Sequence, residues 1–179
     1  MHTHIPPTRT LHLVVCAAPP VRRIAELVDA LQRNRWSVHV IATSTAATWL
    51  DIDDLATRTG HPVLHRQRHP DEPRPLPPAD AVAVVPATFN TINKWAAGIN
   101  DSLALGILNE ALGNQTPTLL APYAKTALTR HPAFPRHLST LAGHGIHVLP
   151  TSAIRPKDDA DSFEWGVVID ALEAMTTPG

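Results

Sequence analysis

Residues 81–106, AVAVVPATFNTINKWAAGINDSLALG, decide the fold of this chain. They open with five small or β-branched apolar residues, a pattern typical of a strand buried on both faces of a parallel sheet. A polar turn at 86–91 follows, and apolar residues then recur at helical spacing over 92–105. Such a turn gathers hydroxyls and the free N–H groups of a helix, and it lies where open α/β sheets bind ligands. The stretch therefore predicts a strand, an anion-binding turn and a helix.

The rest of the chain alternates strands and helices, which predicts a parallel, doubly wound sheet. Further strands are predicted at 11–15, 37–42, 62–65, 116–121 and 146–149. Helices are predicted at 19–35, from the hydroxyl-rich turn 43–45 to about 55, after residue 125 with interruptions at Pro132 and Pro135, and at 163–175. At 179 residues the chain suits one domain. We predict a flexible N-terminal tail at residues 1–9 and a single folded domain at 10–179.

A proline-rich segment interrupts this alternation. Five prolines fall between residues 70 and 78, which excludes a regular helix, so we expect 66–80 to run extended across the surface. A second irregular segment, 157–161, carries mostly charged residues and predicts a solvated loop.

Composition excludes several classes of protein. Lys and Arg number 15 against 16 Asp and Glu, a net charge of −1 that does not suit a nucleic-acid partner. No apolar run reaches membrane-spanning length, and the first residues lack the apolar segment of a signal peptide. The single cysteine, Cys16, fits a reducing cytoplasm and a place in the core. We expect a cytoplasmic protein with no membrane or nucleic-acid partner and no metal site.

Residues 86–99, PATFNTINKWAAGI, resemble the P-A-S/T-x-N-T motif and following helix of the homo-oligomeric flavin-containing cysteine decarboxylases. Asp101 extends the match, and a looser similarity covers about 10–150. That family includes phosphopantothenoylcysteine decarboxylase and the peptidyl-cysteine decarboxylases of modified-peptide pathways. The resemblance implies an α/β, flavodoxin-like (Rossmann-like) fold with a doubly wound parallel sheet, an FMN cofactor and a homo-oligomer, either a trimer or a dodecamer of trimers. We expect a subunit interface to cover the motif helix and its exposed Trp95.

In this architecture, three predicted turns at the carboxyl ends of strands meet one ligand. The chain has neither a G-x-x-x-x-G-K-[ST] loop nor a G-x-G-x-x-G loop, so a mononucleotide fits better than a nucleoside triphosphate or a dinucleotide. Helix capping is an alternative role for the hydroxyls after the second strand, and it is compatible with ligand contact. By resemblance the ligand is FMN, held by Ala17, Ala18, Thr43, Ser44, Ala87, Thr88 and Phe89.

The resemblance also implies residues that contact the substrate. Asn90 matches the family's asparagine that binds the substrate carboxylate beside the flavin; the alternative is a residue that only stabilises its own turn. After the next strand the family often has P-x-M-N, whereas this chain has Pro122-Tyr123-Ala124-Lys125. Tyr123 and Lys125 are therefore predicted to contact the substrate.

A catalytic base is predicted among the histidines upstream of the motif. The family carries a histidine shortly before the strand that leads to the motif, where a near-neutral pKa suits proton transfer. This chain offers His61, His65 and His69 there, and His69 lies nearest to the motif. Exposed loop histidines are the alternative. Their spacing of four residues would make a metal stripe on a helix, but Pro62 and Pro70 argue against that helix.

The predicted function is FMN-dependent oxidative decarboxylation of a cysteine, with the C-terminal cysteine of a precursor peptide as substrate and an enethiol as product. The expected partner is thus a peptide or a small cysteine-containing substrate. Phosphopantothenoylcysteine decarboxylase, a flavin prenyltransferase and a non-catalytic flavin-binding subunit are the alternatives. A prenyltransferase needs a basic pocket for a prenyl phosphate, and the turn at 87–90 carries no charge.

Overall fold

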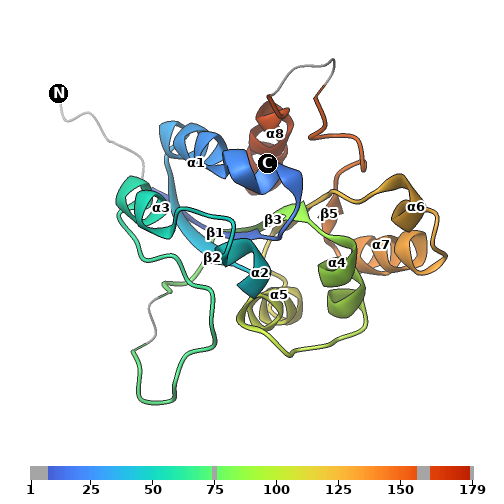
Figure 1. The fold of residues 1–179 in the computed structure, drawn as a ribbon, viewed down its shortest axis with the longest axis horizontal. Helices are drawn as coiled ribbons and strands as arrows, with labels where there is room; N and C mark the ends of the chain where they lie inside the picture. The colour runs from blue at the N-terminus through green and yellow to red at the C-terminus, as the bar shows by residue number, and fades with distance from the viewer. Residues whose placement is uncertain (1–7, 74–75, 157–161, 178–179) are drawn as a thin grey trace.

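The structure, a computed structural model, describes residues 8–73, 76–156 and 162–177. Five parallel strands form one sheet in the order β2-β1-β3-β4-β5 (Figure 1). This confirms the predicted α/β class and the parallel sheet. The strand order reverses between β1 and β3, which makes that point the topological switch of the sheet. The strands are β1 (Arg9–Val15), β2 (Trp36–Ala42), β3 (Ala81–Ala87), β4 (Thr118–Pro122) and β5 (His147–Val148).

Helices cover both faces of the sheet (Figure 1). On the first face lie the 3₁₀ helix η1 (Pro19–Arg23), α1 (Ile24–Arg33) and α8 (Trp165–Thr176). On the second face lie α4 (Phe89–Ala96), α5 (Leu103–Gly113) and α7 (Ala133–Gly143). Three further helices follow strands β2 and β4: α2 (Ser44–Ala47), α3 (Ile52–Thr59) and α6 (Thr126–Thr129). Within the described residues, no helix is long and apolar enough to cross a bilayer.

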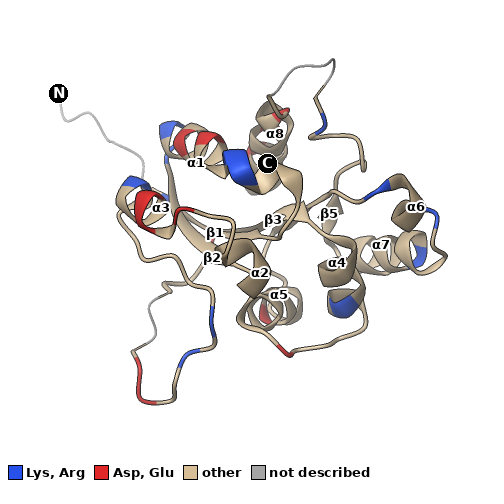
Figure 2. Cartoon of the chain, viewed as in Figure 1, with Lys and Arg blue, Asp and Glu red and all other residues tan. Residues whose placement is uncertain are grey.

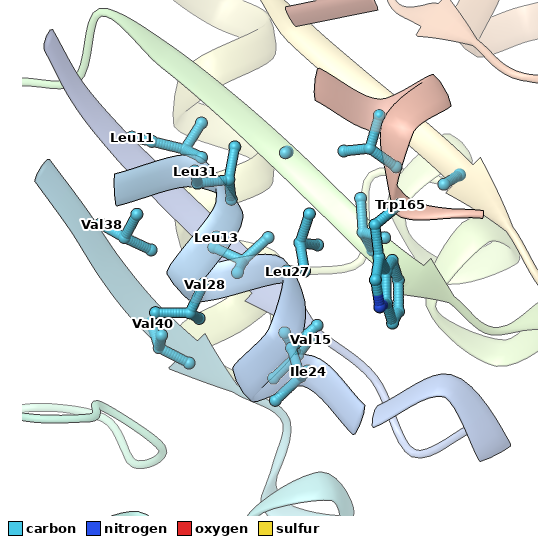
Figure 3. Close-up of a cluster of buried hydrophobic side chains, with 14 of the residues drawn as sticks. Leu11, Leu13, Val15, Ile24, Leu27, Val28, Leu31, Val38, Val40 and Trp165 are labelled. Carbon is cyan, nitrogen blue, oxygen red and sulfur yellow. The ribbon is translucent and has the colours of Figure 1, made fainter. Parts of the chain in front are cut away.

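The side chains of β1 alternate between two hydrophobic clusters, one on each face of the sheet. Val14 and Cys16 face the cluster under α4 and α5. Burying one aliphatic side chain stabilises the fold by about 1.5–3 kcal/mol, so a strand buried on both faces anchors the sheet. Figure 3 shows the other cluster, in which β1 meets α1 and α8: Leu11, Leu13, Val15, Ile24, Leu27, Val28, Leu31 and Trp165.

The predicted single helix at 92–105 is wrong. Helix α4 ends at Ala96, Gly98 adopts a left-handed backbone with φ +72°, and α5 begins only at Leu103. The reversal turns the apolar side chain of Ile99 outward, where it is 41% exposed. It also places Trp95 against the second cluster, where only 2% of it is exposed. The expectation of an exposed Trp95 is therefore wrong too.

Other boundaries also differ from the prediction. The strand predicted at 62–65 is a single bridge between Leu64 and Ile41. The helix predicted from 43 to 55 is two helices, α2 and α3, and the one at 19–35 opens as 3₁₀ helix. Arg9 belongs to β1 and not to a tail, because it pairs with Trp36 in the register of β1 against β2. Its guanidinium also pairs with Glu173 at 2.5 Å and lies over the Trp36 ring. The rest of the predicted tail up to residue 7, and the predicted linker 157–161, lie outside the described residues.

Candidate functional site

A cavity of about 400 Å³, which we call the motif cavity, lies at the carboxyl ends of β1, β2 and β3. Because the strand order reverses between β1 and β3, the cavity occupies the switch point where open α/β sheets bind ligands. The turns after these strands and the first turns of three helices line it. The lining residues are Ala17, Thr43, Ser44, Thr45, Thr88, Asn90, Thr91, Lys94, Asp101, Ser102, Ala104 and Leu105.

Three helices begin at this cavity, and the N-cap residue of each one lines it. The hydroxyls of Thr43, Thr88 and Ser102 cap α2, α4 and α5, respectively. Each hydroxyl oxygen accepts a hydrogen bond from the backbone N–H three residues later, at 3.2, 3.4 and 3.2 Å. The first N–H groups of a helix and its dipole both favour negative charge. The cavity is therefore built to receive an anion.

The charged side chains that line the motif cavity among the described residues are Lys94 and Asp101, and they pair at 2.7 Å. The pair joins α4 to the loop before α5 across the left-handed turn. Half-exposed pairs of this kind contribute about 0–1 kcal/mol to stability, so the main effect of the pair is on loop geometry. The two charges of the described lining therefore balance, which leaves the hydroxyls and backbone N–H groups as the donors for an anionic ligand.

A buried cysteine supports the cavity floor. Cys16 is completely buried, and its Sγ donates to Thr91 Oγ1 at 3.4 Å. Thr88 Oγ1 donates to the same oxygen at 3.3 Å. Burial raises the pKa of the Cys16 thiol, so the thiol stays protonated and acts as a donor. This confirms the predicted place of Cys16 in the core.

Four of the seven residues predicted to hold the cofactor line the motif cavity. They are Ala17, Thr43, Ser44 and Thr88, so Thr43 combines capping with a place in the lining. The other three do not line it: Ala18 and Ala87 are buried, and Phe89 packs against α7, with its ring 6.0 Å from that of Phe134. The part of each residue in cofactor binding stays a prediction.

Several lining residues were missed from the sequence. Ser102 precedes an apolar run and has the form of an N-cap, a signal that is hidden when 92–105 is taken as one helix. Asp101 was noticed as part of the resemblance, yet no role was predicted for it. The pairing of Lys94 with Asp101 depends on the turn at Gly98, which brings residues seven apart within contact distance.

The predicted substrate residues lie on two sides of the motif turn. Asn90 lines the motif cavity in the first turn of α4. Tyr123 and Lys125 do not line it, but they follow the neighbouring strand β4, and the Tyr123 N–H donates to the Ala87 carbonyl at 2.8 Å. The Arg155 guanidinium lies 4.2 Å above the Tyr123 ring. These contacts place 123–125 beside the motif turn.

His69 lies in the exposed segment after β2 and α3, and it does not line the motif cavity. Its Nδ1 is 3.7 Å from the Asp71 carboxylate. The same segment forms one wall of a second cavity of about 690 Å³, whose other wall is α5 and the loop before it. His65 lines this second cavity, and Ser102 lines both cavities. A catalytic role for His69 stays a prediction.

His61 belongs to a group of three imidazoles that lies against the paired strands β1 and β2. Its ring stacks on that of His39 at 3.9 Å, and His12 is the neighbour of His39 across the parallel strands. His12 Nε2 donates to the Pro77 carbonyl at 2.9 Å, which holds the proline-rich segment against the sheet. Burial, then His61 and His12, lower the pKa of His39 to about 4. Burial also lowers the pKa of His12.

Comparison with known proteins identifies the family. A family model described as Flavoprotein matches residues 2–176. This chain belongs to the Flavoprotein family. The match confirms the family resemblance that residues 86–99 predicted.

Among curated proteins, a cysteine/cysteine sulfinic acid decarboxylase from an unknown prokaryotic organism is 38% identical over 71 residues. That stretch covers 40% of this chain and only 19% of the relative's length. Among solved structures, a PPC decarboxylase mutant complexed with pantothenoylaminoethenethiol matches with a TM-score of 0.74 at 19% identity, over 93% of this chain and 97% of the other. The FMN-dependent cysteine decarboxylase SpaF matches with a TM-score of 0.70 at 20% identity, over 92% and 97%. These likenesses confirm the flavodoxin-like fold.

The motif cavity fits a flavin mononucleotide by its own chemistry. Its volume of about 400 Å³ falls in the range of roughly 300–1,000 Å³ that small-molecule sites occupy. Three capped helix N-termini suit one phosphate group, and the small side chain of Ala17 lets a ligand approach the backbone closely. Ala104 and Leu105 add apolar surface on the α5 side.

Proposed function

We propose that this chain binds FMN in the motif cavity and catalyses the oxidative decarboxylation of a C-terminal cysteine in a precursor peptide. The observation that carries the proposal is the position of Asn90, which lines the same cavity as the three capping hydroxyls. The proposed cofactor site and the amide proposed to bind the substrate carboxylate thus line the same cavity.

In this proposal the hydroxyls of Thr43, Ser44 and Thr88 hold the FMN phosphate, together with the N–H groups at the starts of α2 and α4. Bound FMN would accept two electrons from the cysteine side chain. The peptide loses these two electrons, two protons and carbon dioxide, so that its terminal cysteine becomes an enethiol. The amide of Asn90 donates to the substrate carboxylate, which orients it for loss.

The relatives support a cysteine substrate, since the matched curated protein and SpaF are both described as cysteine decarboxylases. Decarboxylation of phosphopantothenoylcysteine is the second candidate, favoured by the likeness to PPC decarboxylase. A prenyltransferase would need a second phosphate site beside the flavin, and Lys94, the one cation in the described lining, is already paired with Asp101.

We also propose a homo-oligomer, either a trimer or a dodecamer of trimers. With Trp95 buried, the large apolar side chains exposed among the described residues are Trp49 at 47%, Ile99 at 41% and Leu128 at 39%. Trp49 and Ile99 flank elements that line the motif cavity. Light scattering of the purified protein should give a mass of at least three chains, and the mass of a single chain at micromolar concentration would contradict this.

Peptide turnover tests the proposed function. The protein reconstituted with FMN is incubated in air with three short peptides. The first ends in cysteine, the second ends in serine, and the third is the cysteine peptide with an amide in place of its C-terminal carboxylate. We expect mass spectrometry to show the loss of carbon dioxide and two hydrogens from the first peptide alone. Phosphopantothenoylcysteine runs in parallel, and its faster turnover would favour the second candidate. Flavin binding without any turnover would assign the chain to the non-catalytic flavoproteins.

A further inference from the structure

One long stretch of the chain carries charge of a single sign. Between Ala111 and Pro156 the sequence contains no Asp or Glu, and its cations are Lys125, Arg130, Arg136 and Arg155. The whole chain has a net charge of −1, whereas this stretch has a net charge of +4 with histidines counted as neutral. Figure 2 shows only basic colouring over α6 and α7, while acidic residues lie on other elements.

Three of these cations lie at exposed positions along α6 and the first turns of α7. Lys125 is the residue before the first turn of α6, Arg130 is the residue after its last turn, and Arg136 lies near the start of α7. All three are exposed, and none forms a salt bridge within the described residues. We call these three residues the basic surface. Arg155 is committed elsewhere, since it lies over Tyr123 and donates to the Ala124 carbonyl at 2.7 Å.

The basic surface borders the motif turn. His131, between Arg130 and Arg136, meets the edge of the Phe89 ring, with the ring centroids 5.6 Å apart. Phe134, in the first turn of α7, stacks on the same ring. Phe89 immediately precedes Asn90 in the chain. Consecutive residues of α4 thus face two sides, Asn90 towards the motif cavity and Phe89 towards α7, so α7 packs on the helix that lines the cavity.

We propose that the basic surface binds acidic residues of the peptide substrate that precede its C-terminal cysteine. This proposal rests on the peptide substrate proposed above. Lys125 and Arg130 are five residues apart, which is about 7.5 Å along the helix, and Arg136 lies farther along the chain. Cations spread in this way suit an extended acidic segment, whereas a single phosphate would need them to converge. Complementary charge at exposed positions acts through encounter rate and specificity, and it weakens in salt.

Peptides of matched length test this proposal. Three peptides end in the same cysteine and differ only upstream, with acidic, neutral or basic residues. At low salt we expect kcat/KM for the acidic peptide to exceed that for the basic one by about tenfold, and the preference to shrink to about twofold in half-molar salt, because exposed charges are screened. Equal kcat/KM values for the three peptides at low salt would overturn the proposal.

Charge reversal locates the effect. Arg130→Glu and Arg136→Glu should each raise KM for the acidic peptide about threefold and leave kcat unchanged, because exposed charges act on encounter and not on chemistry. The matched control is Arg33→Glu, an exposed arginine in the last turn of α1, which should change neither value. Reversal variants that keep the acidic preference of the parent would contradict the proposal. Circular dichroism checks that each variant is folded.

A binding measurement separates this proposal from the proposed function. Labelled peptides that end in serine are titrated by fluorescence anisotropy against the FMN-loaded protein. Binding of the acidic peptide without turnover of any cysteine peptide would support the basic surface and contradict the decarboxylase. Turnover of the cysteine peptides at equal rates, whatever their charge, would support the decarboxylase and contradict the role of the basic surface. If inorganic phosphate displaces the acidic peptide far better than chloride does at equal ionic strength, the surface binds small anions, and the peptide proposal is wrong.

Discussion

The motif turn at 86–91 and the segment at 61–73 both carry candidate catalytic residues, and they are held in place differently. The motif turn lies between a fully buried strand and a capped helix, and its hydroxyls bond to one another and to Cys16. In the other segment Arg66 pairs with Glu72, and Arg68 donates to the carbonyls of His69 and Pro70. The motif turn is thus joined to the distant Cys16, whereas the contacts over 66–73 stay within a few residues. At the start of the second segment, His61 and Leu64 contact β2 instead.

This difference separates a preorganised site from a locally folded loop. Side chains fixed by buried, long-range contacts keep their geometry when a ligand arrives, which is what catalysis and tight binding need. Contacts between exposed neighbours hold a loop together but transmit little to the rest of the fold. Substitutions in the motif turn should therefore alter function strongly, and substitutions over 66–73 should change both function and stability little.

The largest effect is expected for Asn90→Asp. The substitution keeps the size of the side chain, replaces an amide donor with a carboxylate and sets it against the substrate carboxylate. A lost hydrogen bond to a charged group costs about 1.5–3 kcal/mol, and repulsion adds to this, so kcat/KM for a cysteine peptide should fall by about 100-fold or more. FMN should remain bound, as its absorbance spectrum will report. Turnover equal to that of the parent would remove Asn90 from the substrate site.

Thr88→Val should act on the cofactor first. The variant loses the cap of α4 and a hydroxyl in the motif cavity. Removing the cap costs about 1 kcal/mol of stability, and a lost phosphate contact should weaken FMN binding about tenfold or more. The control is Asp51→Ala, which removes the cap of α3 away from the cavity. It should lower Tm to a similar extent and leave the Kd for FMN unchanged; equal Kd values for the two variants would break the comparison.

The histidine group should make the second segment sensitive to acid. An unfolded histidine titrates near pH 6.5, whereas the pKa of His39 is about 4 in the fold. Between these values the unfolded chain binds a proton that the folded chain does not, so stability falls as the pH drops from 6.5 towards 4. His39→Phe should flatten the dependence of Tm on pH in this window. A slope in His39→Phe equal to that of the parent would contradict the assignment.

The smallest effect is expected for His69→Ala. Because this exposed side chain does not line the motif cavity of its own chain, kcat should fall less than about fivefold and the Kd for FMN should not change. Stopped-flow measurement of flavin reduction by a cysteine peptide gives the relevant rate. A loss of about 100-fold would restore His69 as the base and require that it reach the cavity of a neighbouring subunit.

The sequence predicted the parallel sheet and most of the motif turn because those features depend on local pattern. Buried strands such as 81–85 are apolar throughout, and hydroxyls after a strand are N-cap signals wherever they occur. The break at Gly98 was not predicted. Trp95, Ile99 and Leu105 fit the apolar spacing of one continuous helix, so the pattern does not distinguish one helix from two. The group of His12, His39 and His61 was invisible, because it depends on the register of β1 against β2 and on the return of the chain after α3.

The burial of Trp95 could not be predicted from local pattern either. A tryptophan on a motif helix suggests an interface when the helix is considered alone. In the fold, α4 packs against α7 and the sheet, and the indole is taken into the core of the chain itself. Tertiary contacts therefore decided both the residue's burial and the surface that remains for a partner.

The central claim is that the capped N-termini of α2 and α4 form a phosphate site for a flavin. Titration of the flavin-free protein with FMN and with riboflavin, followed by the quenching of flavin fluorescence, tests it most directly, because the two ligands differ only in the phosphate. Two hydrogen bonds to a charged group are worth about 1.5–3 kcal/mol each, so the Kd for FMN should be lower by at least about 100-fold. Equal affinity for FMN and riboflavin would contradict the phosphate site.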